Sequence, residues 1–285
     1  MAGATFVLVP GAGGAAWYWH RAAAELRGRG HRVIAVDLPA EDDSAGLAEY
    51  ADAVMAATSA AGVPMAANAA VADGVAVVDG VAVADGAAVA ANVAVAEGVA
   101  AEDLSALDGG PLVLVAQSMA GLIAPTLGQR LPVSLVVLLN AMIPAPGETG
   151  GQWWQNTGQA EAQRELDLRE GRPVAADFDP RVYFLHDVPQ SVLDEALAHA
   201  PDQSETPFRR PLPEASWPDV PIRVLAGRDD RFFPVEFQRR VARERLGVEV
   251  DEVAGGHLAA LSYPVELADR LEAYLAEYAV GASSR

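Results

Sequence analysis

The sequence contains neither cysteine nor lysine, and all 20 of its basic residues are arginine. The absence of cysteine excludes disulfides, thiolate nucleophiles and cysteine-ligated zinc. The absence of lysine excludes Schiff-base chemistry and the phosphate-binding lysine of a P-loop. Histidine is scarce as well, with five residues in the chain, so a general base has few candidates.

Positive charge is also in short supply. The 39 acidic residues outnumber the basic ones and leave a formal net charge of −19. A surface of that sign repels phosphate groups, so we expect neither nucleic acid nor an anionic membrane as a partner.

Long uninterrupted apolar runs are missing too. The nearest approach is the Ala/Val-rich stretch 62–101, which carries several carboxylates. One carboxylate at the centre of a bilayer costs about 3 kcal/mol, more than the neighbouring valines return. The first residues lack the basic region that precedes the apolar run of a secretory signal. We therefore expect a soluble, cytoplasmic protein.

Short β-branched runs alternate with longer helical patterns along most of the 285 residues, 51% of which are hydrophobic. This alternation indicates an α/β fold with a mostly parallel sheet flanked by helices. The predicted strands are 5–9, 32–37, 112–115, 134–139, 222–226 and 249–253. The predicted helices are 16–29, 45–57, 119–130, 235–246 and 264–278. Residues 1–143 and 220–285 should form the core.

Residues 144–219 interrupt the alternation. This segment is rich in proline, glutamate, arginine and aromatic residues, and it contains two helix-like pieces, 160–170 and 190–200, without strands of its own. We expect it to form a helical cap over the carboxyl ends of the strands. Caps of this kind shape substrate pockets and exclude water.

A second interruption, residues 63–104 within the core, is an array of Ala/Val-rich hexads that repeatedly contain Asp-Gly. Asp-Gly suits a two-residue turn, so a small β-meander is one interpretation; a β-solenoid turn and a poorly ordered loop are the others. The regularly spaced carboxylates would also allow a cation site. We favour a repeat expansion in a surface loop at the amino-terminal edge of the sheet, away from the carboxyl ends where open α/β proteins bind ligands.

Ser118 lies at a strand-to-helix junction in the segment LVLVAQSMAGLIAP. A sharp turn at this point lifts a serine above the sheet, and the small residues Ala116 and Ala120 permit such a turn, although the usual pattern has glycine at both positions. A helix beginning at Met119 would direct its positive end at the serine and favour an oxyanion. Ser118 is the candidate nucleophile, and a helix-capping serine is the alternative.

A serine hydroxyl needs a histidine to accept its proton and an acid to orient that histidine. His257 is the candidate base because it follows two glycines just after the last predicted strand. The acid is expected after strand 222–226, where Asp230 is preferred and Asp229 is the alternative, although aspartate is also a common turn residue. The chain order Ser–Asp–His, with each residue at the carboxyl end of a strand, favours a catalytic triad.

A glycine-rich loop, PGAGG, follows the first predicted strand. Its glycines allow a backbone amide to approach a substrate oxygen, so the N–H groups of Ala12 and Met119 are the candidate oxyanion hole. A phosphate-binding loop is the rival interpretation. The GxGxxG spacing and the P-loop lysine are both missing, which disfavours it.

Together these segments resemble the α/β-hydrolase superfamily, and within it small serine esterases related to plant methylesterases and hydroxynitrile lyases. The similar segments are, in chain order, FVLVPGAGGAAWYWH, GHRVIAVDLPA, LVLVAQSMAG, GRDDRFFPVEFQRR and GGHLAALSYP. The hexad array has no counterpart in that group, and Pro10 stands where the group usually has histidine. Plant hydroxynitrile lyases carry threonine at the position of Gly11 and lysine at that of Leu258, so the resemblance disfavours cyanohydrin cleavage. Ser118 likewise disfavours the branches that use an aspartate nucleophile.

The hypothesis that follows is hydrolysis of a small-molecule carboxylic ester, or a related acyl bond, by Ser118, His257 and Asp230 through an acyl-enzyme. No metal or organic cofactor is implied. Two alternatives stay open: a non-hydrolytic relative, such as a lyase or cofactor-free oxygenase, and a catalytically silent protein that binds a small ligand. Seven side chains are candidates for the substrate pocket, with ordinary core packing as the alternative for the aromatic ones: Trp17, Trp19, Trp153, Trp154, His186, Phe232 and Phe233.

Overall fold

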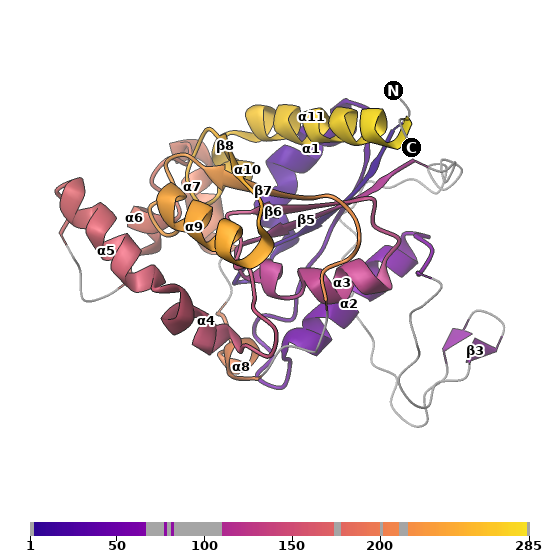
Figure 1. Ribbon diagram of the computed structural model, residues 1–285, viewed down its shortest axis with the longest axis horizontal. Helices are drawn as coiled ribbons and strands as arrows, with labels where there is room; N and C mark the ends of the chain where they lie inside the picture. Colours follow the sequence, from indigo (N-terminus) through magenta and orange to yellow (C-terminus); the bar gives the residue numbers. More distant parts are fainter. Residues whose placement is uncertain are drawn as a thin grey trace.

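The computed structural model describes residues 3–66, 77–78, 81–82, 110–173, 178–199, 202–210 and 216–283. Its centre is a six-stranded parallel sheet in the order β2-β1-β5-β6-β7-β8 (Figure 1). The strands are β1 (Thr5–Val9), β2 (Arg32–Ala35), β5 (Leu112–Gln117), β6 (Leu135–Leu139), β7 (Ile222–Gly227) and β8 (Val250–Val253). All six predicted strands are confirmed, with ends that shift by up to two residues. The central strands are continuous apolar runs because both faces of a parallel sheet are covered.

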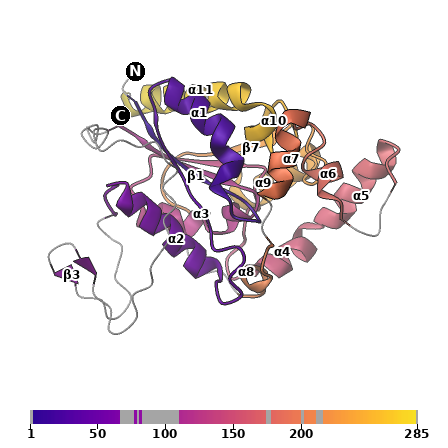
Figure 2. The ribbon, with the colours of Figure 1, turned by 180° about the vertical axis from the view of Figure 1, so that it is seen from behind.

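Helices cover both faces of the sheet (Figures 1 and 2). One face packs against α1 (His20–Gly28) and α11 (Pro264–Ser283), whose leucines and alanines share a buried cluster with alternate residues of the strands. The other face packs against α2 (Leu47–Ala60), α3 (Ala124–Arg130) and α9 (Val235–Leu246). Because strand side chains alternate between faces, each strand contributes to both clusters.

The chain changes direction in the sheet between β1 and β5. After β1 it moves outward to β2, and it then crosses back to β5 on the other side of β1. The register pairs Val9 of β1 with Ala116 of β5, so these two strands end at the same level. Ligands of open α/β sheets bind outside the carboxyl ends of the strands at such a switch point. The loop after β1 and Ser118 after β5 both lie at this position.

Two predicted helices differ from the observed ones. The predicted helix 16–29 is a 3-10 helix, η1 (Ala16–Trp19), followed by α1. The predicted helix 119–130 is a 3-10 helix, η3 (Ser118–Leu122), followed by α3, which has a proline in its first turn. Proline has no backbone N–H to donate within a helix, so it begins a new helix more readily than it continues one.

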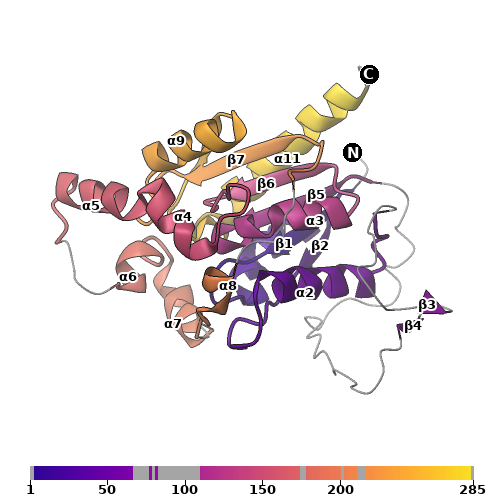
Figure 3. The same cartoon turned by 60° about the horizontal axis from the view of Figure 1, so that its bottom comes forward.

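Within residues 144–219 the described chain is helical, with no strand. It forms α4 (Gly150–Thr157), α5 (Gln159–Arg169), α6 (Pro180–Tyr183), α7 (Gln190–Ala198) and α8 (Thr206–Arg209). These helices gather at the end of the sheet opposite the two termini (Figures 1 and 3). The residues between α6 and α7 pack against η1 and α10 (Ala259–Ser262) through a small apolar cluster that includes Leu185, Val188 and Leu261.

Of the hexad array, β3 (Val77–Val78) and β4 (Val81–Ala82) are described within the repeat proper, and they pair antiparallel. The rest of the predicted meander, with its solenoid and loop alternatives, lies outside the described residues. On either side of it the chain is attached to the core: the Ala66 N–H donates to the Arg130 carbonyl at 3.0 Å, and the Thr5 N–H donates to the Pro111 carbonyl at 3.0 Å. Across the described part of the chain, no helix combines the length and apolar character needed to cross a membrane.

Candidate active site

Ser118 occupies a strained turn directly after β5. Its φ of 53° lies in the left-handed region, which costs a non-glycine residue of order 1–3 kcal/mol unless the surroundings hold it there. The Ser118 carbonyl accepts a hydrogen bond from the Met142 N–H at 2.9 Å. A Cβ added to Gly121 would overlap the Met142 carbonyl oxygen, so glycine allows this close packing. The turn is thus anchored to the loop that follows β6.

The structure brings Ser118, His257 and Asp230 into one hydrogen-bonded chain. The Ser118 Oγ lies 3.0 Å from His257 Nε2, and His257 Nδ1 lies 2.8 Å from Asp230 Oδ2. The Asp230 carboxylate accepts a hydrogen bond from the protonated Nδ1, which leaves Nε2 without a hydrogen and able to accept one from the serine hydroxyl. All three residues are buried, with 7% or less of each exposed. This arrangement can activate a hydroxyl for nucleophilic attack.

The acid side chain in contact with His257 is Asp230, and its neighbour Asp229 is exposed. Asp230 Oδ1 accepts hydrogen bonds from the backbone N–H groups of Phe232 at 2.8 Å and Phe233 at 2.9 Å. These bonds leave Oδ2 directed at the imidazole. The local turn after β7 therefore selects which of two adjacent aspartates points inward.

Buried side-chain amides surround the His257 backbone, and none of them was singled out by the sequence. Asn140, directly after β6, donates from Nδ2 to the carbonyls of Gly256 at 3.1 Å and His257 at 3.0 Å. Its Oδ1 accepts from the Gly227 N–H at 2.7 Å. Gln117, the last residue of β5, donates to the His257 carbonyl at 3.3 Å. The one signal in the sequence was the position of the two residues. Gln117 ends β5 and Asn140 directly follows β6, so both lie at the carboxyl ends of strands beside the site.

The loop after β1 lies against Ser118. A Cβ added to Gly11 would lie 2.7 Å from the Ser118 Cβ. Two glutamines hold this loop: the Gly11 N–H donates to Gln117 Oε1 at 2.9 Å, and the Gly13 N–H donates to Gln203 Oε1 at 2.9 Å. Ala12, between these two glycines, is exposed.

Met119, whose N–H is the other predicted oxyanion donor, is the second residue of η3. The predicted α-helix dipole at Ser118 is not present in that form, because α3 begins at Ala124, beyond a single 3-10 turn. The first N–H groups of any helix still have no partner within it, so the early amides of η3 are donors near the serine.

Three phenylalanines pack around the His257 ring. Phe232 and Phe233 meet it edge to face, with ring centroids 5.4 and 5.2 Å away. Phe184, which the sequence did not indicate, stacks on it at 4.8 Å with an interplanar angle of 19°. Phe184 directly follows α6, so the segment predicted to be a cap supplies a wall of the site.

The predicted pocket tryptophans fall into different environments. Trp153 is fully buried in the core, where its indole N–H donates to the Ile143 carbonyl at 3.0 Å; it is not on a substrate-facing surface. Trp19 is buried beside α1 and borders a cavity of about 10 Å³ next to His257, the size of a single water. Trp154 packs on Phe232 and is partly buried. Trp17 stacks on His199 at 4.7 Å.

His186 contacts the acid-bearing loop. Its Nε2 lies 3.1 Å from the Asp229 carbonyl, which can only accept, so this nitrogen carries the proton. Burial lowers the pKa of the His186 imidazole below its ordinary value. A neutral side chain is therefore favoured at this contact.

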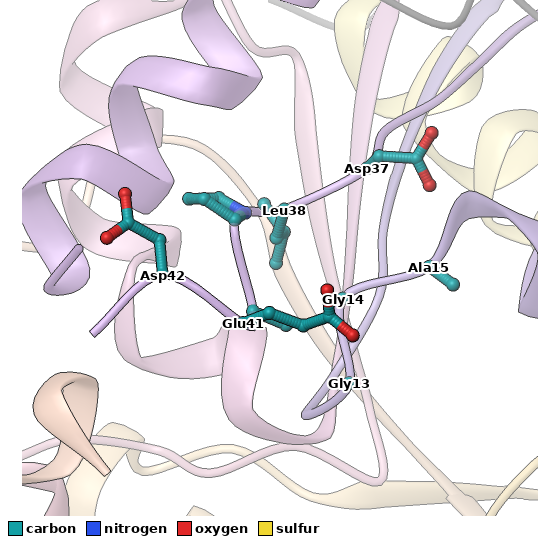
Figure 4. A pocket seen from close by; sticks show the side chains of 9 residues that line it. Gly13, Gly14, Ala15, Asp37, Leu38, Glu41 and Asp42 are labelled. Atoms are coloured by element: carbon teal, nitrogen blue, oxygen red, sulfur yellow. The ribbon is translucent and has the colours of Figure 1, made fainter. Parts of the chain in front are cut away.

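A larger cavity, of about 340 Å³, lies beside the loop after β1. It is lined by Gly13, Gly14 and Ala15 and by residues 37–42, three of which are acidic (Figure 4). Asp37 at its edge accepts a hydrogen bond from the Ala16 N–H at 2.6 Å. None of the seven predicted pocket side chains lines this cavity. Among the described residues, no group of three or more carboxylate and imidazole side chains is placed to hold a metal ion.

A parallel sheet with a serine at the strained end of β5, a histidine after β8 and an acid after β7 is the arrangement of an α/β hydrolase. Residues 6–270 match the model of the alpha/beta hydrolase family, and the chain belongs to that family.

Individual relatives share 18–28% sequence identity with this chain. The chain is 28% identical to the "Probable esterase PIR7A" of Oryza sativa subsp. indica, over 97% of this chain and 98% of the rice protein. Among solved structures it is similar to polyneuridine aldehyde esterase, with a TM-score of 0.63, 18% identity and coverage of 95% and 99% of the two chains. It is also similar to a pyrethroid hydrolase from Sphingobium faniae JZ-2, with a TM-score of 0.59, 21% identity and coverage of 95% and 97%. At these identities the solved structures establish the fold alone.

Proposed function

We propose that this protein is a serine carboxylesterase that hydrolyses a small-molecule ester through an acyl-enzyme. The observation that carries the proposal is the buried chain from Ser118 Oγ through His257 to Asp230, with contacts of 3.0 and 2.8 Å. Membership of the alpha/beta hydrolase family and the name of the rice relative support ester hydrolysis as the class of reaction.

In the acylation step, Ser118 Oγ attacks the ester carbonyl carbon while His257 Nε2 accepts the hydroxyl proton. Asp230 stabilises the resulting imidazolium and keeps its ring in place. The N–H groups of Ala12 and Met119 are assigned to the carbonyl oxygen as it becomes negative; one such donor is worth about 10²–10³ in rate. His257 then returns the proton to the departing alkoxide, which leaves as an alcohol.

Deacylation repeats these steps with water. His257 takes a proton from a water molecule, the resulting hydroxide attacks the acyl carbon, and the proton passes to Ser118 Oγ as the acid product leaves. We assign residues 144–219 the role of a cap, because Phe184 from this segment covers the His257 ring. Phe184, Phe232 and the partly buried Trp154 offer the substrate an apolar, aromatic surface beside the reacting bond.

The first test is covalent labelling of Ser118 with a fluorophosphonate probe, followed by peptide mass spectrometry and an ester-substrate panel. We expect an adduct on Ser118 in the wild type. Ser118→Ala and His257→Ala should lose labelling, and kcat should fall by about 10⁶-fold for a lost triad serine or histidine. Ser59→Ala, on the exposed side of α2, is the matched control and should label normally.

A second comparison separates the two adjacent aspartates. Asp230→Asn keeps the shape of the acid but favours the wrong histidine tautomer, which costs about 10⁴-fold in kcat. Asp229→Asn should remain near wild type, because its side chain is exposed. Equal losses in the two variants would contradict the assignment of the acid. Absence of labelling in folded protein would overturn the esterase proposal and favour a non-hydrolytic relative or a silent binding protein.

A further inference from the structure

Asp187, in the turn between α6 and α7, reaches across to the loop that carries His257. Its Oδ2 accepts a hydrogen bond from the Gly256 N–H at 2.6 Å, across 69 residues of sequence. Gly256 directly precedes His257. A hydrogen bond to an ionised acceptor is roughly twice as strong as a neutral one, so this contact is a firm hold on the backbone beside the base.

The carbonyls of Gly256 and His257 are held by a residue of the core. Asn140 Nδ2 donates to the Gly256 carbonyl at 3.1 Å and to the His257 carbonyl at 3.0 Å. Gly256 therefore donates its N–H to Asp187 in segment 144–219, while its carbonyl accepts from Asn140 directly after β6. Gly255, the first glycine of the turn, has a φ of 101°, a conformation that glycine enters and leaves easily. The Asp229 N–H also donates to the Gly255 carbonyl at 2.9 Å, and Gln117 donates to the His257 carbonyl, so Asp187 adds the hold on the Gly256 N–H to contacts that engage the carbonyls of the turn.

The fit around Asp187 is close. A Cβ on Gly256 would lie 3.1 Å from Asp187 Oδ1 and 2.7 Å from His186 Nε2. Asp187 Oδ1 is buried and has no hydrogen-bond partner among the described residues. Among the described residues, the hydrogen bond that this carboxylate makes is therefore the one with the Gly256 N–H.

The neighbouring residue makes the equivalent contact on the acid loop. His186 Nε2 donates to the Asp229 carbonyl at 3.1 Å, and Asp229 directly precedes Asp230. Two consecutive cap-segment residues thus hold the backbone immediately before the base and immediately before the acid. Because of these two hydrogen bonds, a shift of the segment between α6 and α7 would change the distance between His257 and Asp230.

We propose that Asp187 is a positioning residue for His257, which aligns the imidazole between Ser118 and Asp230 by holding the Gly256 N–H. The inference rests on the proposed esterase function. A misplacement of about 1 Å in a catalytic group can cost about 10²-fold in rate. Loss of this hold should therefore lower kcat more than it lowers substrate binding.

The test compares Asp187→Ala with Asp179→Ala. Asp179 lies in the same segment, and its exposed carboxylate also accepts a backbone hydrogen bond, from the Arg181 N–H at 2.9 Å at the start of α6. Among the described residues it makes no hydrogen bond to either triad loop. We expect Asp187→Ala to lower kcat and the rate of fluorophosphonate labelling by about 10–100-fold with little change in KM. Asp187→Asn retains an oxygen that can accept the Gly256 N–H and should recover most of the rate. Asp179→Ala should behave as wild type.

A spectroscopic measurement reports the same geometry without a substrate. The proton on His257 Nδ1, shared with Asp230, should give a downfield signal in the proton NMR spectrum. We expect this signal in the wild type and in Asp179→Ala, and its loss or broadening in Asp187→Ala. If Asp187→Ala does not fold, Asp187→Ser makes the comparison, because serine stays polar but is too short to reach the Gly256 N–H.

Wild-type kcat, labelling and NMR signal in folded Asp187→Ala would overturn the proposal. So would an equal loss of rate in Asp179→Ala, since both residues would then act only through the stability of the segment. If the wild type neither labels nor turns over esters, the esterase function fails instead. The NMR comparison then decides the positioning role alone, and an unchanged signal in Asp187→Ala would refute it.

Discussion

At the scale of single residues, Gly11 lies close against Ser118. A Cβ at Gly11 would lie 2.7 Å from both Gln117 Oε1 and the Ser118 Cβ, and 3.2 Å from the Ser118 Oγ. Neither neighbour can move freely, because Gln117 also binds the His257 carbonyl and Ser118 is held in the left-handed region. Glycine at position 11 therefore lets the loop after β1, which carries the proposed oxyanion donor Ala12, approach Ser118.

Gly11→Ala should push the loop and the nucleophile apart. We expect kcat/KM to fall by about 10²-fold or more, comparable to losing one oxyanion donor, with only a modest change in melting temperature. The control is Gly28→Ala at the end of α1, where an added Cβ meets no atom within 4 Å. Steady-state kinetics and thermal unfolding of the two variants check this, and full activity in Gly11→Ala would show that the loop is not held as tightly as the contact indicates.

At the scale of elements, one buried ion pair joins α9 to the chain just before α4. Arg245 on α9 forms a bidentate contact with Glu148, with its Nη1 2.5 Å from Oε2 and its Nη2 3.0 Å from Oε1. Burial alone would raise the pKa of Glu148, but the hydrogen bonds from Arg245, the Ala145 N–H and Asn156 outweigh it and hold the pKa below its ordinary value. The pairing therefore stabilises the folded protein fully at pH values above the pKa that the Glu148 carboxyl has in the unfolded chain. This stabilisation is lost as the pH falls through the lower pKa that the carboxyl has in the folded protein.

Arg245→Leu should destabilise the protein by about 3–5 kcal/mol at neutral pH, because it leaves the Glu148 carboxylate buried without its partner. Adding Glu148→Gln should recover part of that loss by removing the unpaired charge. Urea unfolding of the wild type, the single variant and the double variant measures both effects. A single variant as stable as the wild type would mean that water reaches the carboxylate and that the pair does not join the two elements.

At the scale of the whole molecule, the described chain on either side of the hexad array is attached to the hydrolase core. Thr5 to Val9 pair in register with Leu112 to Ala116, and the described chain on either side of the array is hydrogen-bonded to the core. The first residues of β5 lie at the amino-terminal edge of the sheet, whereas Ser118 follows its carboxyl end. The described chain thus resumes after the array at the opposite end of β5 from Ser118.

Replacing residues 67–109 with a flexible Gly/Ser linker should leave ester hydrolysis within about two-fold of wild type, since loop length changes stability only slowly, by about 0.6 kcal/mol per doubling. Activity on the same ester panel, together with circular dichroism, checks this. A variant that keeps its secondary structure but loses activity would place the array in the function of the site.

Contacts that complete the site join residues far apart in the chain, and this is why the sequence did not reveal them. Asn140 and Asp187 hold the same turn from two directions, across 116 and 69 residues. Neither belongs to a recurring pattern, and an amide or carboxylate after a strand or in a turn is ordinary on its own. Phe184 likewise lies on His257 only because the segment between α6 and α7 folds back over the carboxyl ends of the strands.

The sequence by itself determined the fold class and the placing of the strands, because apolar runs, helical periodicity and turn residues are local properties that survive without knowledge of the partner surfaces. It also brought the serine, acid and histidine candidates to the carboxyl ends of parallel strands, where topology makes neighbours of distant residues. Only the tertiary structure decided between Asp229 and Asp230, separated the core Trp153 from the aromatic rings around His257, and split the helix after Ser118. These outcomes depend on the directions of single side chains and on local backbone geometry. Packing and hydrogen bonds between distant segments determine both.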